Sequence, residues 1–242
     1  MTPTEHPPFL GVWMDTEAGA KPSREPLSRA RIVEAALRVL DREGADGLSM
    51  RTVAQELDTA ATSLYRHVHN KGELLDLALD SMMGEVLLPP ADTDWRAAMH
   101  SIATNLRKVL MSHRDAAMLH GERMAIGPNA LARMEYMCSK LIASGFSEEQ
   151  AAAAAATVIN YTVGSVLGEA MPTAALQASG YTWQQFAEEM SRRVDALPLD
   201  RFPTVRRMLP MLLGHHHDQP FEYGLEALLD GLAIRRDVTL DA

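Results

Sequence analysis

Residues 62–75 read TSLYRHVHNKGELL, a stretch in which a short polar helix ends and a longer helix begins. Asn70 stands three residues before Glu73, which is the spacing of an N-cap residue and its capping-box partner, and apolar residues follow. A helix is therefore expected from residue 70 onward. The segment before it, 59–68, is shorter than the roughly 12 residues at which an isolated helix becomes stable in water. Neighbouring elements must hold it in place.

Two further helices are predicted before this stretch. Apolar residues within 32–40 recur at helical spacing after Ser28, and the pattern stops at Gly44. A second helix begins with Ser49 as its N-cap. It is followed by a tight turn containing Asp58, at a place where glycine would reach the left-handed conformation without strain. Three short helices with a tight turn before the last one are typical of a helix-turn-helix, whose last helix enters the DNA major groove.

The remainder of the chain carries helical signals without a competing strand pattern, so the predicted fold class is all-α. Capping boxes are expected at Ser147 with Gln150 and at Thr182 with Gln185. Residues 1–26 are predicted to be a disordered leader, residues 27–72 a helix-turn-helix DNA-binding domain, and residues 73–242 a larger helical ligand-binding and dimerisation domain. Breaks between helices are expected at Pro89, Pro90, Gly127, Pro128, Gly145, Gly180, Pro198 and Gly214.

Composition limits the cellular setting of the chain. Of its 242 residues 47% are hydrophobic, yet no uninterrupted apolar run approaches the ~20 residues needed to cross a bilayer. The N-terminus lacks the features of a secretion signal, so no membrane partner and a cytoplasmic location are predicted. A single cysteine, Cys138, excludes an internal disulfide and is expected to be a small buried hydrophobe.

Charge is unevenly distributed along the chain. Residues 21–72 hold nine Lys or Arg against seven acidic residues, a net charge of +2, whereas the whole chain has a net charge of −9. The remaining residues are therefore strongly acidic. A slightly basic module on an acidic body is expected when only one end of a protein meets phosphate.

The short polar helix offers side chains suited to DNA. Ala60 and Leu64 are expected to face the other two helices, which leaves the intervening and following residues free to point outward. Arg66 can pair with guanine through two hydrogen bonds, and hydroxyls can bond base edges or phosphates. The alternative is that an exposed Arg or His on a short helix is merely solvated.

The stretch from Leu27 to Asp80 resembles the DNA-binding domain of the tetracycline-repressor (TetR) family, and LYRHVHNKGELL at 64–75 is its most specific part. The resemblance continues in LMSHRDAAMLH, LIASGFS and YTVGSVLGEA, which look like the ligand-binding domain of the tetracycline repressors. It implies a homodimer formed through residues 147–170 and 221–236. It also implies that the DNA-contacting positions are Arg51, Ala61, Thr62, Ser63, Tyr65, Arg66, His67 and Lys71.

The same resemblance bears on the ligand. His120 matches the histidine that ligates drug-bound magnesium in the tetracycline repressors, but their other drug contacts, a histidine, an asparagine, a phenylalanine and a glutamine, fall on Leu87, Ile102, Leu106 and Met137. The glutamate near the metal falls on Gly168, with Glu169 one position later. Each polar group of a tetracycline left without a partner would cost about 1 to 3 kcal/mol. Magnesium also prefers an octahedral set of oxygen ligands, so tetracycline with magnesium is not expected to bind.

A mostly apolar, polycyclic or aromatic effector is predicted instead. Methionine adapts to irregular shapes, and the few polar groups would orient the ligand. His120 is either such a polar anchor or a packing histidine, and the apolar residues could equally be ordinary core. The three histidines of HHHD at 215–218 splay in different directions and are read as a solvated loop, so no metal and no cofactor are predicted. The predicted pocket consists of Leu87, Ile102, Leu106, His120, Met134, Met137 and Asn160.

The predicted function is a ligand-responsive, homodimeric transcriptional regulator, a repressor released from a pseudo-palindromic operator in double-stranded DNA by a small molecule. Two alternatives remain open. One is a dimer that binds DNA constitutively without a ligand. The other is a helical enzyme, for which the sequence shows no nucleophile elbow, glycine-rich phosphate loop or two-histidine zinc motif.

Overall fold

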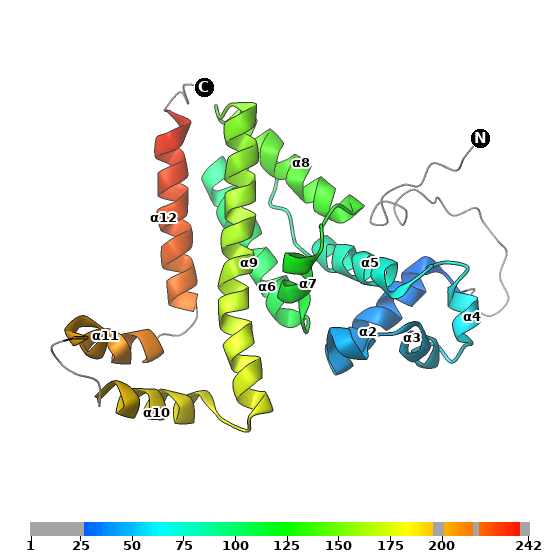
Figure 1. Ribbon diagram of the computed structural model, residues 1–242. Helices are drawn as coiled ribbons and strands as arrows, with labels where there is room; N and C mark the ends of the chain where they lie inside the picture. Colours follow the sequence, from blue (N-terminus) through cyan, green and yellow to red (C-terminus); the bar gives the residue numbers. More distant parts are fainter. Residues whose placement is uncertain (1–26, 196–200, 215–217, 238–242) are drawn as a thin grey trace, which may run out of the picture. The chain divides into compact units, whose positions relative to one another are not determined.

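The computed structural model describes residues 27–195, 201–214 and 218–237, and within these ranges all regular structure is α-helical (Figure 1), which confirms the predicted fold class. By contacts the chain forms two compact units, 1–163 and 164–242, which are described separately. The helices are α2 (Arg29–Gly47), α3 (Met50–Glu56), α4 (Ala61–Leu64), α5 (Lys71–Gly84), α6 (Trp95–Ser112), α7 (Ala116–Glu122), α8 (Pro128–Ala143), α9 (Glu148–Ala178), α10 (Trp183–Asp195), α11 (Pro203–Gly214) and α12 (Asp218–Arg236).

The first two helices begin where the sequence predicts. Ser28 caps α2 by accepting a hydrogen bond from the backbone N–H of Arg31. The helix was predicted to stop at Gly44. The backbone there leaves helical geometry with φ of +79°, which produces a kink, and helical structure continues after it to Gly47. Ser49 caps α3, and its partner in the capping box is Thr52. These local hydrogen bonds fix where the helices of the head, defined as residues 27–72, start and stop.

The short helix is shorter than predicted. α4 covers only Ala61–Leu64, whereas a helix over 59–68 was expected, and the chain then turns through residues 65–67. Asp58 has φ of +48°, which confirms the left-handed turn before it. The prediction that Ala60 faces the other helices is wrong, because Ala60 is the extended N-cap residue and is exposed. Leu64 alone anchors α4, with no exposed surface.

The predicted capping box at Asn70 is half correct. The side chain of Asn70 accepts from the backbone N–H of Glu73 at 2.9 Å. The Glu73 carboxylate, however, accepts from the backbone N–H of His69 at 2.7 Å and also contacts its imidazole, so the reciprocal bond falls one residue earlier. Glu73 is nearly buried and reaches back past the N-cap residue because His69 offers it two nitrogen atoms.

Helix α5 is the central element of the first unit, because α2, α6, α7 and α8 all pack against it. Residues 73–80 of this helix are buried on every side. Two of them are carboxylates with defined partners. Asp76 pairs with Arg123 at 2.6 Å, and Asp80 accepts from the backbone N–H groups of Asn129 and Ala130 at the start of α8. The helix that leaves the head is therefore also the core of the segment that follows it.

The rest of the chain follows the predicted breaks where the structure describes them. Ser147 and Gln150 exchange both capping-box bonds at the start of α9, and Thr182 and Gln185 do so at α10. In the second unit α10 packs against α11. The predictions for the leader 1–26, for Pro198 and for the three histidines 215–217 lie outside the described residues.

The long helix α9 has an unusually apolar composition. Its segment Glu148–Glu169 has a mean hydropathy of 1.3 and is long enough to cross a membrane, although polar residues interrupt its apolar runs. Core helices of soluble proteins share this property. The only cysteine, Cys138 on α8, is a free thiol that is half-buried rather than fully buried, and burial raises the pKa of this thiol.

Candidate nucleic-acid interface and effector site

The predicted DNA-contacting residues surround the short helix α4 and are accessible to solvent. Tyr65 is 51% exposed at the end of α4, while Leu64 beside it is fully buried. The buried leucine thus fixes the helix while its other side chains face outward. Exposed residues of the set are Arg51, Thr62, Tyr65 and Arg66, and partly exposed ones are Ala61, Ser63, His67 and Lys71.

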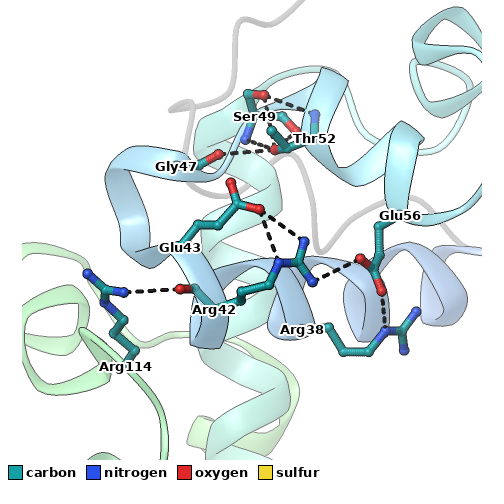
Figure 2. Close-up of polar contacts among 8 residues, drawn as sticks. All are labelled: Arg38, Arg42, Glu43, Gly47, Ser49, Thr52, Glu56 and Arg114. Atoms are coloured by element: carbon teal, nitrogen blue, oxygen red, sulfur yellow. Dashed lines mark hydrogen bonds and ion pairs between the residues drawn. The ribbon is translucent and has the colours of Figure 1, made fainter.

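Two arginines of the head are engaged within the protein (Figure 2). Arg38 Nε donates to Glu56 Oε1 at 2.8 Å, and Arg42 Nη1 donates to Glu56 Oε2 at 3.1 Å. The hydrogen bond from Arg38 and, to a smaller extent, that from Arg42 lower the pKa of Glu56. Both bonds keep this carboxylate charged. The pair ties α2 to α3. Fewer positive side chains of the head are therefore available to bind phosphate than its number of Lys and Arg residues suggests.

Lys71 also has a partner inside the protein. Its Nζ donates to the backbone carbonyl of Ala45 at 2.8 Å and so links the start of α5 to the end of α2. Arg29 makes a similar link, since its Nε donates to the carbonyl of His67 at 3.2 Å. Both bonds hold the turn between α4 and α5 in place. Lys71 retains two further N–H donors for a phosphate.

The loop between α6 and α7 forms a joint with the end of α2. His113 bridges two carboxylates, since its Nδ1 lies 3.1 Å from Asp41 and its Nε2 lies 3.0 Å from Glu85. Arg114 donates to the carbonyl of Arg42 at 3.1 Å (Figure 2), and Asp115 accepts from the backbone N–H of Ala45 at 2.8 Å. In the sequence this SHRD segment is a family signature, and the joint that it forms was not predicted. Three consecutive polar residues between apolar helices were the available signal.

The pKa of His113 is raised above its ordinary value. Burial alone would lower this pKa, but hydrogen bonds to Glu85 and Asp41 and the charges of both carboxylates raise it more. Carboxylates only accept hydrogen bonds, so both contacts form together only when both imidazole nitrogens carry a proton. The joint is therefore strongest with a protonated His113.

Part of the predicted effector pocket is buried on helices that pack together, and its three fully buried residues are called the enclosed layer. Ile102 and Leu106 on α6 and Met137 on α8 have no exposed surface, and α6 packs against both α7 and α8. Met134 is half-buried. Leu87 is 70% exposed and Asn160 is exposed, so these two lie outside this enclosed group.

His120, on α7, is the polar member of the set. Its Nε2 is buried and has no hydrogen-bond partner within the described parts of the chain. Burial, and next the positive charge of Arg133, lower the pKa of His120 and favour the neutral imidazole. Arg133 itself was missed by the sequence analysis, although its position between Ala130 and Met137 on one face of a helix was visible.

A helix-turn-helix head joined to an all-helical body with an enclosed apolar layer defines a class of protein, the ligand-responsive DNA-binding regulators. Comparison with known families specifies the class further. Residues 32–78 match the bacterial regulatory proteins of the tetR family, and residues 88–236 match the Tetracyclin repressor-like C-terminal domain. The chain belongs to this family.

Individual relatives agree with this assignment. An HTH-type transcriptional regulator of Saccharopolyspora erythraea is 44% identical over 161 residues, which cover 66% of this chain and 68% of that protein. The HTH-type transcriptional repressor DrrR1 of Streptomyces coeruleorubidus is 33% identical over 224 residues, covering 90% and 83%. The crystal structure of ActR from Streptomyces coelicolor in complex with actinorhodin matches with a TM-score of 0.76 and 34% identity, covering 86% and 96%.

Family membership establishes the general function. The protein is a transcriptional repressor that binds operator DNA as a dimer and responds to a small-molecule effector. Its relatives are regulators and not enzymes, and the family consists of soluble DNA-binding proteins.

Proposed function

We propose that this protein represses transcription from a pseudo-palindromic operator in the cytoplasm, and that a mostly apolar small molecule releases it. The division into a DNA-binding domain over 27–72 and an effector and dimerisation domain over 73–242 belongs to this proposal, as does the absence of catalytic activity. The observation that carries it is the short helix α4, which is anchored by the fully buried Leu64 and leaves its polar side chains to solvent.

The DNA contacts divide into two kinds. Arg66 reads a base, because an exposed guanidinium can donate two hydrogen bonds to guanine. Arg51, Tyr65 and Lys71 bind phosphates, with Lys71 using the donors that Ala45 leaves free. His67 also fits a phosphate, and the smaller residues Ala61, Thr62 and Ser63 complete the contact surface.

Dimerisation is proposed through residues 147–170 of α9 and 221–236 of α12. Both helices expose small or apolar side chains, including Ala152 and Ala156 on α9 and Ile234, which is 69% exposed, on α12. A methyl group added at Gly164 or Gly231 would meet nothing within 4 Å in the single chain, so each position leaves room for close approach by a second copy.

The effector proposal rests on the enclosed layer of Ile102, Leu106 and Met137, which offers no polar atoms to a tetracycline. ActR, a relative of similar fold, has been crystallised with actinorhodin. Leu87, Met134 and Asn160 would join the site only as the effector enters, because their side chains are exposed or half-buried here. His120 is its polar anchor.

Footprinting and binding measurements on operator DNA test the proposal. We expect two protected half-sites whose centres lie about 34 to 36 Å apart. Affinity should fall with salt at a log-log slope near −0.9 per phosphate neutralised. Arg66→Ala should cost about 1 to 3 kcal/mol at one base pair per half-site, whereas Arg51→Ala should weaken all sequences alike. A uniform loss for Arg66→Ala would refute its role in reading a base.

The effector half of the proposal is tested on the labelled operator. Polycyclic aromatic compounds should release the protein, and tetracycline with magnesium should not. Release by micromolar tetracycline would overturn the assignment. A dimer whose operator affinity and thermal unfolding respond to no compound would instead be the constitutive DNA-binding protein that is the alternative.

A further inference from the structure

A positively charged side chain lies in the apolar face of α8. The buried residues of this helix are Ala130, Arg133, Met137 and Leu141, which recur at helical spacing on one side. Arg133 is only 3% exposed. Arginine is almost never fully buried unless it is paired, so its position among core residues requires a reason.

The guanidinium of Arg133 has few partners. Its Nη1 donates to the thioether sulfur of Met83 at 3.1 Å, a weak acceptor, and its Nε has no hydrogen-bond partner in the described structure. The negative charge of Asp80 raises the pKa of Arg133. The carboxylate oxygens of Asp80, however, accept hydrogen bonds from Asn129 and Ala130. No ion pair joins Asp80 to Arg133 among the described residues.

Desolvation leaves Arg133 charged nonetheless. Burial lowers the pKa of Arg133 to about 10, against the raising effect of Asp80, so the group is protonated at neutral pH. The positive charge also helps to keep the neighbouring His120 neutral. The chain thus holds a buried cation without a carboxylate bound to it, an arrangement that normally destabilises a protein.

Other buried polar atoms without a hydrogen-bond partner in the described residues include His120 Nε2 on α7 and Thr104 Oγ1 on α6. Helix α6 packs against both α7 and α8, and the apolar Ile102, Leu106 and Met137 are fully buried on α6 and α8. Unsatisfied donors beside an apolar wall are what a site for a ligand with one polar end requires.

We propose that the effector carries an acidic oxygen group, a carboxylate or an equally acidic hydroxyl, which binds Arg133. Its apolar body packs against Ile102, Leu106 and Met137, and His120 supplies a second, neutral contact. This inference rests on the proposed release by a small molecule and specifies the chemical class of that molecule. The enclosing side chains must separate to admit it, because they have no exposed surface here.

The stability of the protein without ligand provides the first test. In Arg133→Met the buried charge is replaced by an apolar chain of similar length, so Tm should stay equal or rise by about 2 to 4 °C. Arg123→Met is the matched control, because Arg123 is paired with Asp76 at 2.6 Å and with the Gly72 carbonyl at 2.8 Å. The control should lose stability. A similar loss in Arg133→Met would show that the guanidinium serves the fold and would overturn the proposal.

The second test uses a matched pair of probes, anthraquinone-2-carboxylic acid and anthraquinone-2-carboxamide, which differ in charge at neutral pH. With the wild-type dimer the acid should shift Tm and release labelled operator at concentrations at least about tenfold lower than the amide. In Arg133→Met this ratio should fall to about one. Equal potency on the wild-type protein, an acid preference that survives the substitution, or no shift with either probe contradicts the assignment.

Failure of this inference can be distinguished from failure of the proposed function. Operator binding without any probe reports the repressor function, and it is measured on the wild-type protein. A chain that binds no operator refutes the proposed function, while its thermal shift still reports whether Arg133 selects acids. A chain that is released equally well by acid and amide keeps the proposed function and refutes the acidic effector.

Discussion

The imidazole of His113 hydrogen-bonds the carboxylate of Asp41, which lies 72 positions earlier in the chain, at 3.1 Å. This contact connects the loop after α6 to the last turns of α2. It places a titratable group at the joint between the helix-turn-helix head and the segment that contains the proposed effector site, so the strength of the joint depends on pH.

The first prediction concerns this pH dependence. The folded-state pKa of His113 is raised, so its contribution to the free energy of unfolding is fully present below the ordinary value of 6.5 and is lost as pH rises through the raised value. Urea unfolding of the wild-type protein and His113→Asn should therefore differ most at acidic pH. The difference should be about 1 kcal/mol, because both carboxylates are partly exposed and water screens them.

Glu85→Gln provides the control for the His113 experiment. The amide keeps a hydrogen-bond acceptor near Nε2 but removes one negative charge, so the pH-dependent part of the stability should shrink. A stability difference between wild type and His113→Asn that is constant across pH 5 to about 8 would show that the histidine acts only through packing.

The second prediction compares Leu64, the last residue of α4, with Tyr65, which follows it. Leu64→Ala should lower the free energy of unfolding by about 2 to 5 kcal/mol, since it opens a cavity under the helix. Tyr65→Ala should change stability by less than about 0.5 kcal/mol because the ring is half exposed, yet it should weaken operator binding. Wild-type operator affinity in Tyr65→Ala would remove this residue from the contact surface.

The third prediction concerns the kink at Gly44. Its φ of +79° disfavours any side chain, and an added Cβ would lie 2.7 Å from Asp115 Oδ2. Gly180 has a similar φ of +74° but open space around it, so Gly180→Ala is the control without the steric contact, and backbone strain there should cost about 1 to 2 kcal/mol. Thermal unfolding should show a clearly larger loss for Gly44→Ala. Equal losses would mean that the Asp115 side chain moves aside without cost.

The fourth prediction concerns the cap of α3. Thr52 Oγ1 accepts from the Ser49 backbone N–H at 2.8 Å and can donate to the Gly47 carbonyl at 3.1 Å (Figure 2). Thr52→Val keeps the shape and removes these bonds, and it should cost about 1 to 2 kcal/mol. Thr157→Val is the control, because that exposed hydroxyl bonds only within its own helix at Ala153. Chemical denaturation should separate the two variants.

The features that the sequence predicted correctly are local. The caps at Ser28, Ser49, Ser147 and Thr182 depend on atoms within three residues, so their spacing is visible in the chain. The all-helical class follows from periodicity in the same way. For the capping box at Asn70, the backbone N–H that donates to the Glu73 carboxylate belongs to His69 and not, as predicted, to Asn70. The choice between these two N–H groups depends on how the side chains of His69 and Glu73 fit together.

The features that the sequence did not predict involve distant partners. The engagement of Arg38 and Arg42 by Glu56 depends on how α2 and α3 cross, and the joint at His113 depends on the meeting of α2, α5 and the loop after α6. The burial of Arg133 depends on which face of α8 meets α5. The apolar residues Ile102, Leu106 and Met137 were predicted, but the cation beside them was not.

The bond from the Ala45 backbone to Asp115 has a consequence for hybrid regulators, in which a head is transplanted onto the body of another protein. A cut after residue 72 keeps the whole helix-turn-helix, yet it leaves behind the side chain that receives the kinked end of α2. The new body must then supply an acidic side chain at the same place, where Gly44 of the transplanted head leaves room for it. Transplants that carry residues 113–115 along with the head should retain regulation by the new body, whereas those without them should bind DNA and ignore its effector.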